Sequence, residues 1–225
     1  LEMGGKNPTL IFKDSDFDLA VENSIKSAFL NQGQICLCGS RILVEESVYE
    51  KFKSVFVKKA TELVVGNPEN KKSNLGAIVS SDHLNSILSK IDLAKKGGGK
   101  VLCGGSRVSL PGKLANGYYL SPTIIENTKI SDSINQEEVF GPVATIIPFK
   151  SEKEAIEMCN NTKYGLSASI FTQNISRAHR VAAKLDAGVI WINSWLVRDL
   201  RIPFGGMKSS GVGREGGFGS LEFFT

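Results

Sequence analysis

The sequence predicts an α/β fold of three layers, in which helices cover both faces of a largely parallel β-sheet. Two observations lead to this fold class. Short apolar runs typical of buried strands alternate along the chain with amphipathic segments of helical period. The segments between consecutive strands are also long enough to hold a helix, which parallel pairing requires. At 225 residues the chain is long enough to bury a sizeable core in one domain.

The first half of the chain predicts four strands and three helices. The strands are expected over residues 8–12, 41–44, 100–103 and 118–120. Asp16 should begin a helix that runs towards Phe29, and a second helix is expected over residues 48–63. A third helix should carry its apolar face at residues 84, 87, 88 and 91 and end at the glycines 97–99. Residues 104–117 are rich in Gly and Pro and predict a surface loop.

The second half repeats this alternation. Strands are expected over residues 143–147, 167–171 and 188–193. Ser151 and Glu154 form a capping-box pattern at the start of the helix after the first of these strands. The next helix should place one apolar stripe at Ile175, Ala178, Val181, Ala182 and Leu185. From Ser194 onward a loop is expected, followed by residues 221–225, which are typical of a strand that is cut short.

Composition argues against several classes of function. The 27 basic residues are scattered and the net charge is only +4, which disfavours nucleic-acid binding. Neither an apolar stretch long enough for a membrane span nor a secretory signal is present in these residues, so a cytoplasmic protein is predicted. The cysteines at 36, 38, 103 and 159 offer neither a CxxC pair nor a histidine cluster, so no metal site is predicted. Free thiols suit a reducing compartment.

Cys36 is the candidate nucleophile. Gly33 permits a tight turn beside it, and the amide dipoles of such a turn can favour the reactive thiolate. The alternative is a buried structural cysteine, which is the interpretation for Cys38, Cys103 and Cys159.

Glu2 is the candidate general base, because its apolar neighbours and the following glycines could desolvate it and raise its pKa. The alternative is a solvated carboxylate near the chain end. A strand and a helix lie between Glu2 and Cys36 and could bring both residues to one cleft.

Residues 1–8 (LEMGGKNP) and 29–36 (FLNQGQIC) closely resemble the two signature motifs of the aldehyde dehydrogenase superfamily, at the spacing which that family uses. Residues 137–142 (EEVFGP) resemble a third motif. There the resemblance implies that Glu138 holds the hydroxyls of the nicotinamide ribose and that Phe140 packs beside the nicotinamide. From the residues alone, Glu138 could equally be a carboxylate at a helix end. The resemblance also places Phe204 in the aldehyde tunnel and gives Asn193 a structural role near the active site.

Arg198 is the candidate reader of a substrate carboxylate, because arginine binds carboxylates in a bidentate manner. The alternative is a surface ion pair with Asp199. The run from Asn193 to Gly206 resembles the branch of the family that acts on 2-aminomuconate and 2-hydroxymuconate semialdehydes. Within that resemblance, the distance of Arg198 from Phe204 matches a tunnel-lining position better than that of Arg201.

The resemblance covers residues 1–225 and implies the catalytic domain of an NAD-dependent enzyme that oxidises an aldehyde through a Cys36 thiohemiacetal and thioester, which Glu2 helps to hydrolyse. It also implies that the amino-terminal NAD-binding domain and the carboxy-terminal oligomerisation strand of the parent protein lie outside this chain. The partners implied are a small aldehyde, that missing domain, and further copies in a homodimer or homotetramer. The alternatives are an enzyme for neutral aldehydes, a cofactor-free thiol esterase and a non-catalytic structural relative.

Overall fold

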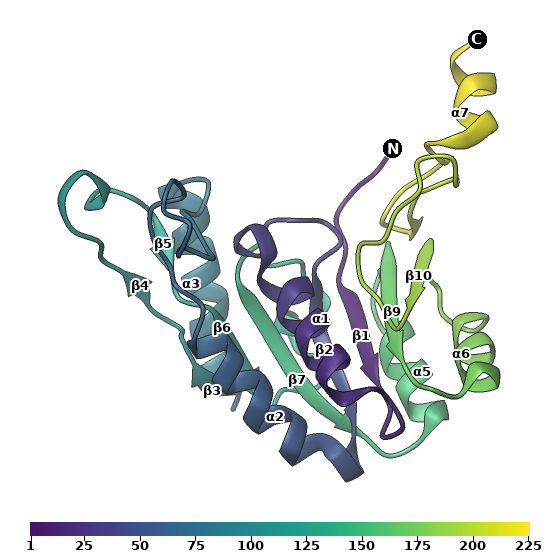
Figure 1. Cartoon of the computed structure of the whole chain (residues 1–225), viewed down its shortest axis with the longest axis horizontal. Coiled ribbons are helices and arrows are strands. Elements are labelled where there is room, and N and C mark those ends of the chain that lie inside the picture. The colour runs from purple at the N-terminus through teal and green to yellow at the C-terminus, as the bar shows by residue number, and fades with distance from the viewer.

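The computed structural model describes residues 1–225 and places a seven-stranded β-sheet at the centre of the molecule (Figure 1). The strand order is β10-β9-β1-β2-β7-β6-β3. Every neighbouring pair is parallel except β3 and β6, which are antiparallel. The seven strands are β1 (Asn7–Ile11), β2 (Gly39–Glu45), β3 (Lys100–Cys103), β6 (Thr123–Glu126), β7 (Val143–Phe149), β9 (Ser167–Phe171) and β10 (Val189–Ile192). The predicted largely parallel sheet is therefore confirmed.

Helices cover both faces of this sheet, as predicted. The long helices are α1 (Phe17–Phe29), α2 (Glu46–Thr61), α3 (Ser81–Lys96), α5 (Glu152–Asn160) and α6 (Ile175–Ala182). In Figure 1, α1 and α2 lie in front of the sheet. Their buried side chains share one core cluster, whereas α5 and α6 share another with the alternate residues of the same strands. The three-layer arrangement follows from this alternation.

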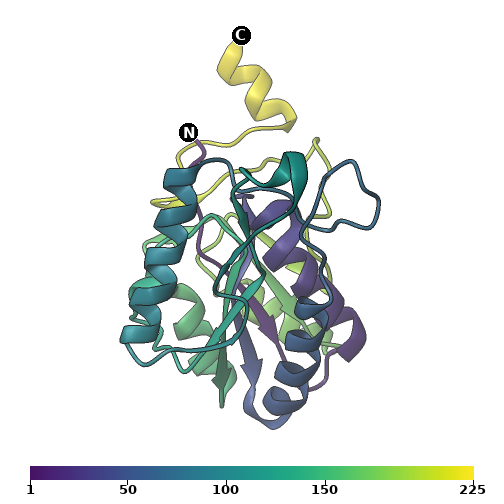
Figure 2. The ribbon, with the colours of Figure 1, turned by 90° about the vertical axis from the view of Figure 1, so that its left-hand side faces the viewer.

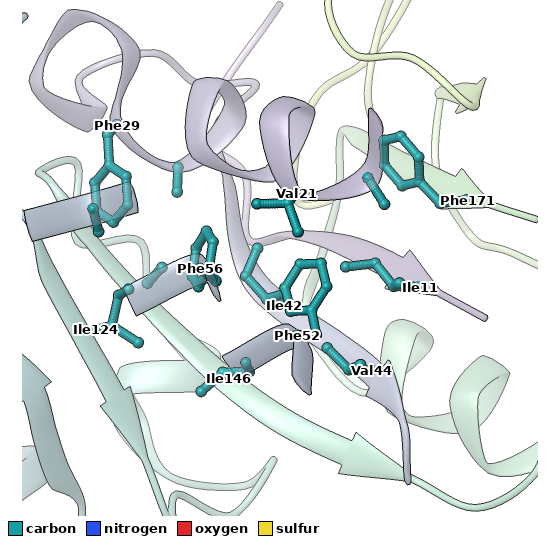
Figure 3. Close-up of a cluster of buried hydrophobic side chains, with 14 of the residues drawn as sticks. Ile11, Val21, Phe29, Ile42, Val44, Phe52, Phe56, Ile124, Ile146 and Phe171 are labelled. Carbon is teal, nitrogen blue, oxygen red and sulfur yellow. The ribbon is translucent and has the colours of Figure 1, made fainter. Parts of the chain in front are cut away.

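The core on the α1–α2 side is built from strand aliphatics and helix phenylalanines (Figure 3). Ile11 faces this cluster, whereas its neighbours Leu10 and Phe12 face the α5–α6 side. Phe56 of α2 lies between Phe29 and Phe52, with ring centroids 6.1 and 5.7 Å away. Strands that are apolar on both sides are what a parallel sheet between two helical layers requires.

The predicted helix starts are confirmed by their capping bonds. The Asp16 side chain accepts a hydrogen bond from the Leu19 amide, and the Ser151 hydroxyl accepts one from the Glu154 amide. The carboxylate of Glu154 reaches back to the amide of Lys150, one residue before the expected partner. These bonds satisfy amides that have no partner within the helix.

Several local predictions were wrong. Residues 221–225 are not a strand, because they belong mostly to the helix α7 (Gly217–Phe224), which projects from the body of the molecule in Figure 2. Ile175 does not join the buried stripe of α6 and is 67% exposed. The loop 104–117 contains a short strand and a helical turn, and further short elements were not expected. These additional elements are β4 (Arg107–Val108), η2 (Gly112–Leu114), α4 (Ser133–Gln136), β8 (Tyr164–Gly165) and β11 (Met207–Lys208). The strand predicted over residues 118–120 is confirmed as β5 (Tyr119–Leu120), which pairs with β4 outside the main sheet.

The loops that carry the candidate residues Glu2, Cys36, Glu138 and Phe140 converge at the amino ends of β1, β2 and β7. Residues 1–6 lead into β1, residues 30–38 into β2 and residues 137–142 into β7. Because these three strands are neighbours and parallel, their amino ends lie side by side at one edge of the sheet. Ligands of open α/β sheets usually bind at the carboxyl ends, so this location departs from the general rule. None of the helices is both long and apolar enough to cross a membrane.

Candidate active site

The segment before Cys36 is a tight left-handed turn. Asn31, Gln32 and Gly33 have φ angles of 51°, 57° and 67° in the turn η1 (Leu30–Gly33). A Cβ atom at Gly33 would lie 2.1 Å from the carbonyl oxygen of Gly141, so only glycine fits against the loop before β7. This close approach holds the thiol segment against the segment that carries Glu138 and Phe140.

Asn7 fixes the carbonyl groups on either side of Leu37. Its Nδ2 donates to the carbonyl oxygens of Cys36 at 2.8 Å and Cys38 at 2.9 Å. Its Oδ1 accepts the amide N–H of Ser167 at 3.0 Å, and the whole residue is buried. Asn7 therefore ties the thiol segment to β1 and β9, a role that the sequence analysis did not assign.

Cys36 itself is half-buried, and its pKa is raised. Burial is the largest cause, followed by the negative charges of Glu2 and Glu138, whereas the amides of Cys36 and Leu37 act in the opposite direction. The amides therefore favour the thiolate, as expected, but burial and the two carboxylates outweigh them. Cys38 and Cys159 are buried, as predicted, and Cys103 is only partly buried.

Glu2 lies beside the loop that follows β11. Residues 1–3 pair with residues 210–212, and Glu2 forms an isolated antiparallel bridge with Gly211. Although Glu2 is largely exposed, its pKa is raised by partial burial and then by the charge of Glu215, while Arg198 lowers it. Because Glu2 also raises the pKa of Cys36, the two groups lie within electrostatic reach of each other. The fold thus brings together the predicted nucleophile and base.

Glu138 is held from the backbone of the same amino-terminal segment. The amide of Gly5 donates to its Oε1 at 3.0 Å, and Lys90 donates to its backbone carbonyl at 2.8 Å. A Cβ atom on Gly4 would lie 2.1 Å from Oε2. Burial raises the pKa of Glu138, whereas the Gly5 amide and the nearby lysines lower it.

Phe140 is 38% exposed and has a positive φ of 54°. Its carbonyl oxygen lies 2.7 Å from Nε2 of His83. A carbonyl only accepts hydrogen bonds, so this contact assigns the proton to Nε2. His83 is thus partly buried and bonded to the loop of Phe140, whereas His179 is exposed.

Arg198 does not pair with Asp199. Its Nη2 donates to Oε1 of Glu215 at 2.6 Å, and its guanidinium lies 4.2 Å from the ring centroid of Phe204. Asp199 pairs instead with Arg201, whose Nε donates to Oδ1 at 2.9 Å. The ion-pair alternative for Arg198 therefore has the wrong partner, and Glu215 is a charged residue of the site that sequence reasoning missed.

Trp195 anchors the Arg198 loop against the thiol segment, because its indole N–H donates to the carbonyl of Leu37 at 3.0 Å. A cleft of about 260 Å³ opens at this edge and is lined by Glu2, Phe204 and Glu215, among others. Cys36 and Arg198 lie outside its lining. The structure therefore places the predicted base and tunnel aromatic in one cleft, with the nucleophile and the arginine beside it.

Asn193 lies at the carboxyl end of β10, where its side chain bonds the backbone N–H and C=O of Thr172 at 3.0 and 2.9 Å. This contact is structural and lies at the strand end opposite to the one from which the site loops emerge. Residues 211–216 spell GxGxxG and form a loop beside residues 1–3. The strand before them, β11, has only two residues and pairs antiparallel with β8 outside the main sheet, so it is not the buried parallel strand that a dinucleotide fingerprint needs. No group of three or more His, Cys, Asp or Glu side chains is arranged to hold a metal ion.

Two residues of the site fit the nicotinamide end of a dinucleotide. One carboxylate oxygen of Glu138 is engaged by Gly5, and the other lies in space that glycine at position 4 leaves free of a side chain. A carboxylate held in this way can accept hydrogen bonds from the two hydroxyls of a ribose. The exposed ring of Phe140 offers an apolar surface in the neighbouring loop.

The aldehyde dehydrogenase family model matches residues 1–225, and the chain belongs to that family. A 2-aminomuconic semialdehyde dehydrogenase of Danio rerio is 48% identical over the whole chain, and a 2-hydroxymuconic semialdehyde dehydrogenase of Pseudomonas sp. (strain CF600) is 45% identical. The chain covers 47% and 46% of these relatives, respectively, so it spans about half of their length.

Among solved structures, a betaine aldehyde dehydrogenase of Staphylococcus aureus in complex with NAD⁺ is 41% identical, with a TM-score of 0.95. The match covers 100% of this chain and 44% of that structure. The fold predicted from the sequence is thus the fold of a half-length segment of aldehyde dehydrogenases.

Proposed function

We propose that this chain supplies the catalytic thiol, the base and part of the nicotinamide site of an NAD-dependent aldehyde dehydrogenase. Its substrate is a carboxylate-bearing semialdehyde such as 2-aminomuconate semialdehyde, which is oxidised to the acid. The observation that carries the proposal is the position of Cys36, half-buried and within electrostatic reach of two carboxylates from separate segments, Glu2 and Glu138.

Cys36 acts as the nucleophile. The Cys36 thiol gives its proton to solvent water, and the thiolate sulfur then bonds to the aldehyde carbon to form a thiohemiacetal with a negative oxygen. The backbone N–H of Cys36, which already lowers the pKa of the thiol, is the donor for the oxygen that becomes negative in this step. When bound, NAD supplies the acceptor for the hydride that leaves the former aldehyde carbon. A thioester on Cys36 remains.

Glu2 acts as the base for the second half of the reaction. Its pKa is raised by partial burial and by Glu215, which makes it a better proton acceptor than a fully solvated carboxylate. It removes a proton from water, whose oxygen attacks the thioester carbon. The acid product leaves, and the Cys36 thiolate is regenerated. Glu138 and Phe140 are proposed to hold the ribose and the nicotinamide, respectively.

Arg198 is proposed to bind the carboxylate of the substrate. Only its Nη2 donates to a protein acceptor, and the remaining guanidinium N–H groups have no bond within the chain. The names of the Danio rerio and Pseudomonas relatives support an acidic semialdehyde as substrate. Phe204 stacks with Arg198 and is proposed to line the aldehyde path. The cytoplasmic location, the homo-oligomeric assembly and the separate NAD-binding domain of the parent protein remain predictions.

The test compares adipate semialdehyde with hexanal, two aldehydes of equal carbon count, in the full-length gene product. Arg198→Ala should lower kcat/KM for the acidic aldehyde by about tenfold to a hundredfold, since one charged contact is lost. The value for hexanal should change little. Arg201→Ala, which removes an exposed arginine paired with Asp199, is the matched control. An equal loss for both aldehydes would indicate an enzyme for neutral aldehydes instead.

A further inference from the structure

Arg198 already has a carboxylate partner in the protein. Nη2 of Arg198 lies 2.6 Å from Oε1 of Glu215, at the distance of a charge-assisted hydrogen bond. Glu215 comes from the glycine-rich loop 211–216, whose only part in the proposed chemistry so far is the effect of the Glu215 charge on the pKa of Glu2. A substrate carboxylate that approaches Arg198 therefore meets a guanidinium that is already neutralised by a resident negative charge.

The backbone fixes Glu215 at this position. Phe204 and Glu215 form an antiparallel bridge in which each amide donates to the carbonyl of the other, both at 2.7 Å. The guanidinium carbon of Arg198 lies 4.2 Å from the ring centroid of the same Phe204. One aromatic residue thus holds the arginine through its ring and the glutamate through its backbone. The pair is therefore held in place by Phe204 beside the cleft, which Glu215 lines and Arg198 does not.

Both members of the pair keep access to solvent. The side chain of Arg198 is 33% exposed and that of Glu215 is 54% exposed. An ion pair of this kind is weak enough to be exchanged for a ligand, because water screens its attraction. Glu215 also lines the cleft together with Glu2 and Phe204, so its charge acts on whatever occupies that cleft.

We propose that Glu215 is a specificity-determining positioning residue that competes with the substrate carboxylate for Arg198. The charge of Glu215 lowers the preference for acidic aldehydes that Arg198 creates, in two ways. The Glu215 carboxylate occupies one edge of the Arg198 guanidinium, and it repels the carboxylate of the substrate. This inference rests on the proposed function of Arg198 as the reader of the substrate acid.

The test is Glu215→Gln in the full-length gene product, assayed with adipate semialdehyde and hexanal. Glutamine keeps the size of the side chain and an oxygen that can accept from Arg198, but it removes the charge. The ratio of kcat/KM for the acidic aldehyde to that for hexanal should rise by about two- to fivefold, through a lower KM for the acidic aldehyde. Any effect that Glu215 exerts on Glu2 cancels in this ratio, because Glu2 serves both substrates.

Two further variants complete the test. Glu69→Gln makes the same charge change in an exposed loop and should leave the ratio unchanged. In an Arg198→Ala background, Glu215→Gln should no longer change the ratio, because the competition acts through the arginine. An unchanged or lower ratio in the single Glu215→Gln variant would overturn the inference, as would a rise that persists without Arg198. If the proposed function of Arg198 is wrong, Arg198→Ala alone will lower kcat/KM equally for both aldehydes. This outcome distinguishes failure of the proposed function from failure of the inference about Glu215.

Discussion

Gly5 donates its backbone N–H to Oε1 of Glu138 at 3.0 Å, across a sequence separation of 133 residues. Through this bond the segment that carries the proposed base also orients the carboxylate proposed to hold the cofactor ribose. Cys36, Glu2 and Glu138 thus lie on neighbouring segments at one edge of the sheet. A substitution at Gly4 or Gly5 should therefore weaken cofactor binding more than it destabilises the fold.

Gly4→Ala should weaken NAD binding. Its Cβ would lie 2.1 Å from Oε2 of Glu138, so the end of that flexible side chain must move. We expect the KM for NAD to rise by about five- to thirtyfold, the equivalent of ~1–2 kcal/mol, with little change in thermal stability. Gly219→Ala is the matched control, because a Cβ there meets no atom within 4 Å. Unchanged NAD kinetics in Gly4→Ala would argue against Glu138 as a cofactor contact.

Glu2→Gln should make the Cys36 thiol more reactive even though it abolishes turnover. The negative charge of Glu2 is the second cause that raises the pKa of Cys36, after burial. Removing it stabilises the thiolate, so the pKa of Cys36 falls and alkylation by iodoacetamide at neutral pH becomes faster. The pH dependence of Cys36 labelling, followed by peptide mass spectrometry, measures this shift. Slower labelling of Cys36 in the variant would mean that Glu2 does not face the thiol.

Lys6→Met should stabilise the protein at neutral pH. Lys6 is 3% exposed, and burial lowers its pKa from 10.5 to about 7. Between these two pKa values the unfolded chain holds a proton that the native state has released, so the stability of the native protein rises with pH over this window. The advantage of the methionine variant should shrink by on the order of 1–3 kcal/mol between pH 7 and pH 10. Urea denaturation of both proteins at the two pH values measures this difference in the free energy of unfolding. A difference that stays the same at both pH values would contradict the lowered pKa of Lys6.

Arg41→Met should destabilise the fold strongly. Arg41 is fully buried and donates to the carbonyl oxygens of Lys6, Met158 and Cys159 at 2.8–2.9 Å. Methionine fills the space but leaves these buried acceptors without donors, at a cost of about 3 kcal/mol or more. Arg180→Met, which removes an exposed ion pair with Glu152, should cost less than about 1 kcal/mol. Equal losses in urea denaturation for the two variants would contradict this role of Arg41.

The sequence was sufficient for the main architecture, because apolar runs such as residues 41–44 and caps such as Asp16 act locally. It was insufficient where tertiary contacts decide the structure. β6 (Thr123–Glu126) was missed, although it is wholly buried and pairs with β7 and β3. The aromatic residues of 221–225 suggested a strand, but they pair with no strand in the structure and form a helix.

In the candidate site, too, the sequence predicts the residues that lie in motifs but not the contacts that depend on the tertiary structure. Motifs located Cys36, Glu2 and Glu138, and the fold brings all three together. Composition and periodicity contain no signal for the contact between Arg198 and Glu215, which depends on how the loop after β10 folds back across Phe204. The net rise in the pKa of Cys36 was likewise missed, because it depends on burial and on two carboxylates that come from distant segments.

The most direct test of the central claim is to trap the acyl group on Cys36. The Glu2→Gln variant of the full-length gene product would be incubated with adipate semialdehyde and NAD, digested, and analysed by mass spectrometry. We predict that the peptide containing Cys36 gains the mass of the acyl group, because the thioester forms but is not hydrolysed without the base. An unmodified Cys36, or an acyl group on Cys38 or Cys103 instead, would contradict the assignment of Cys36 as the nucleophile.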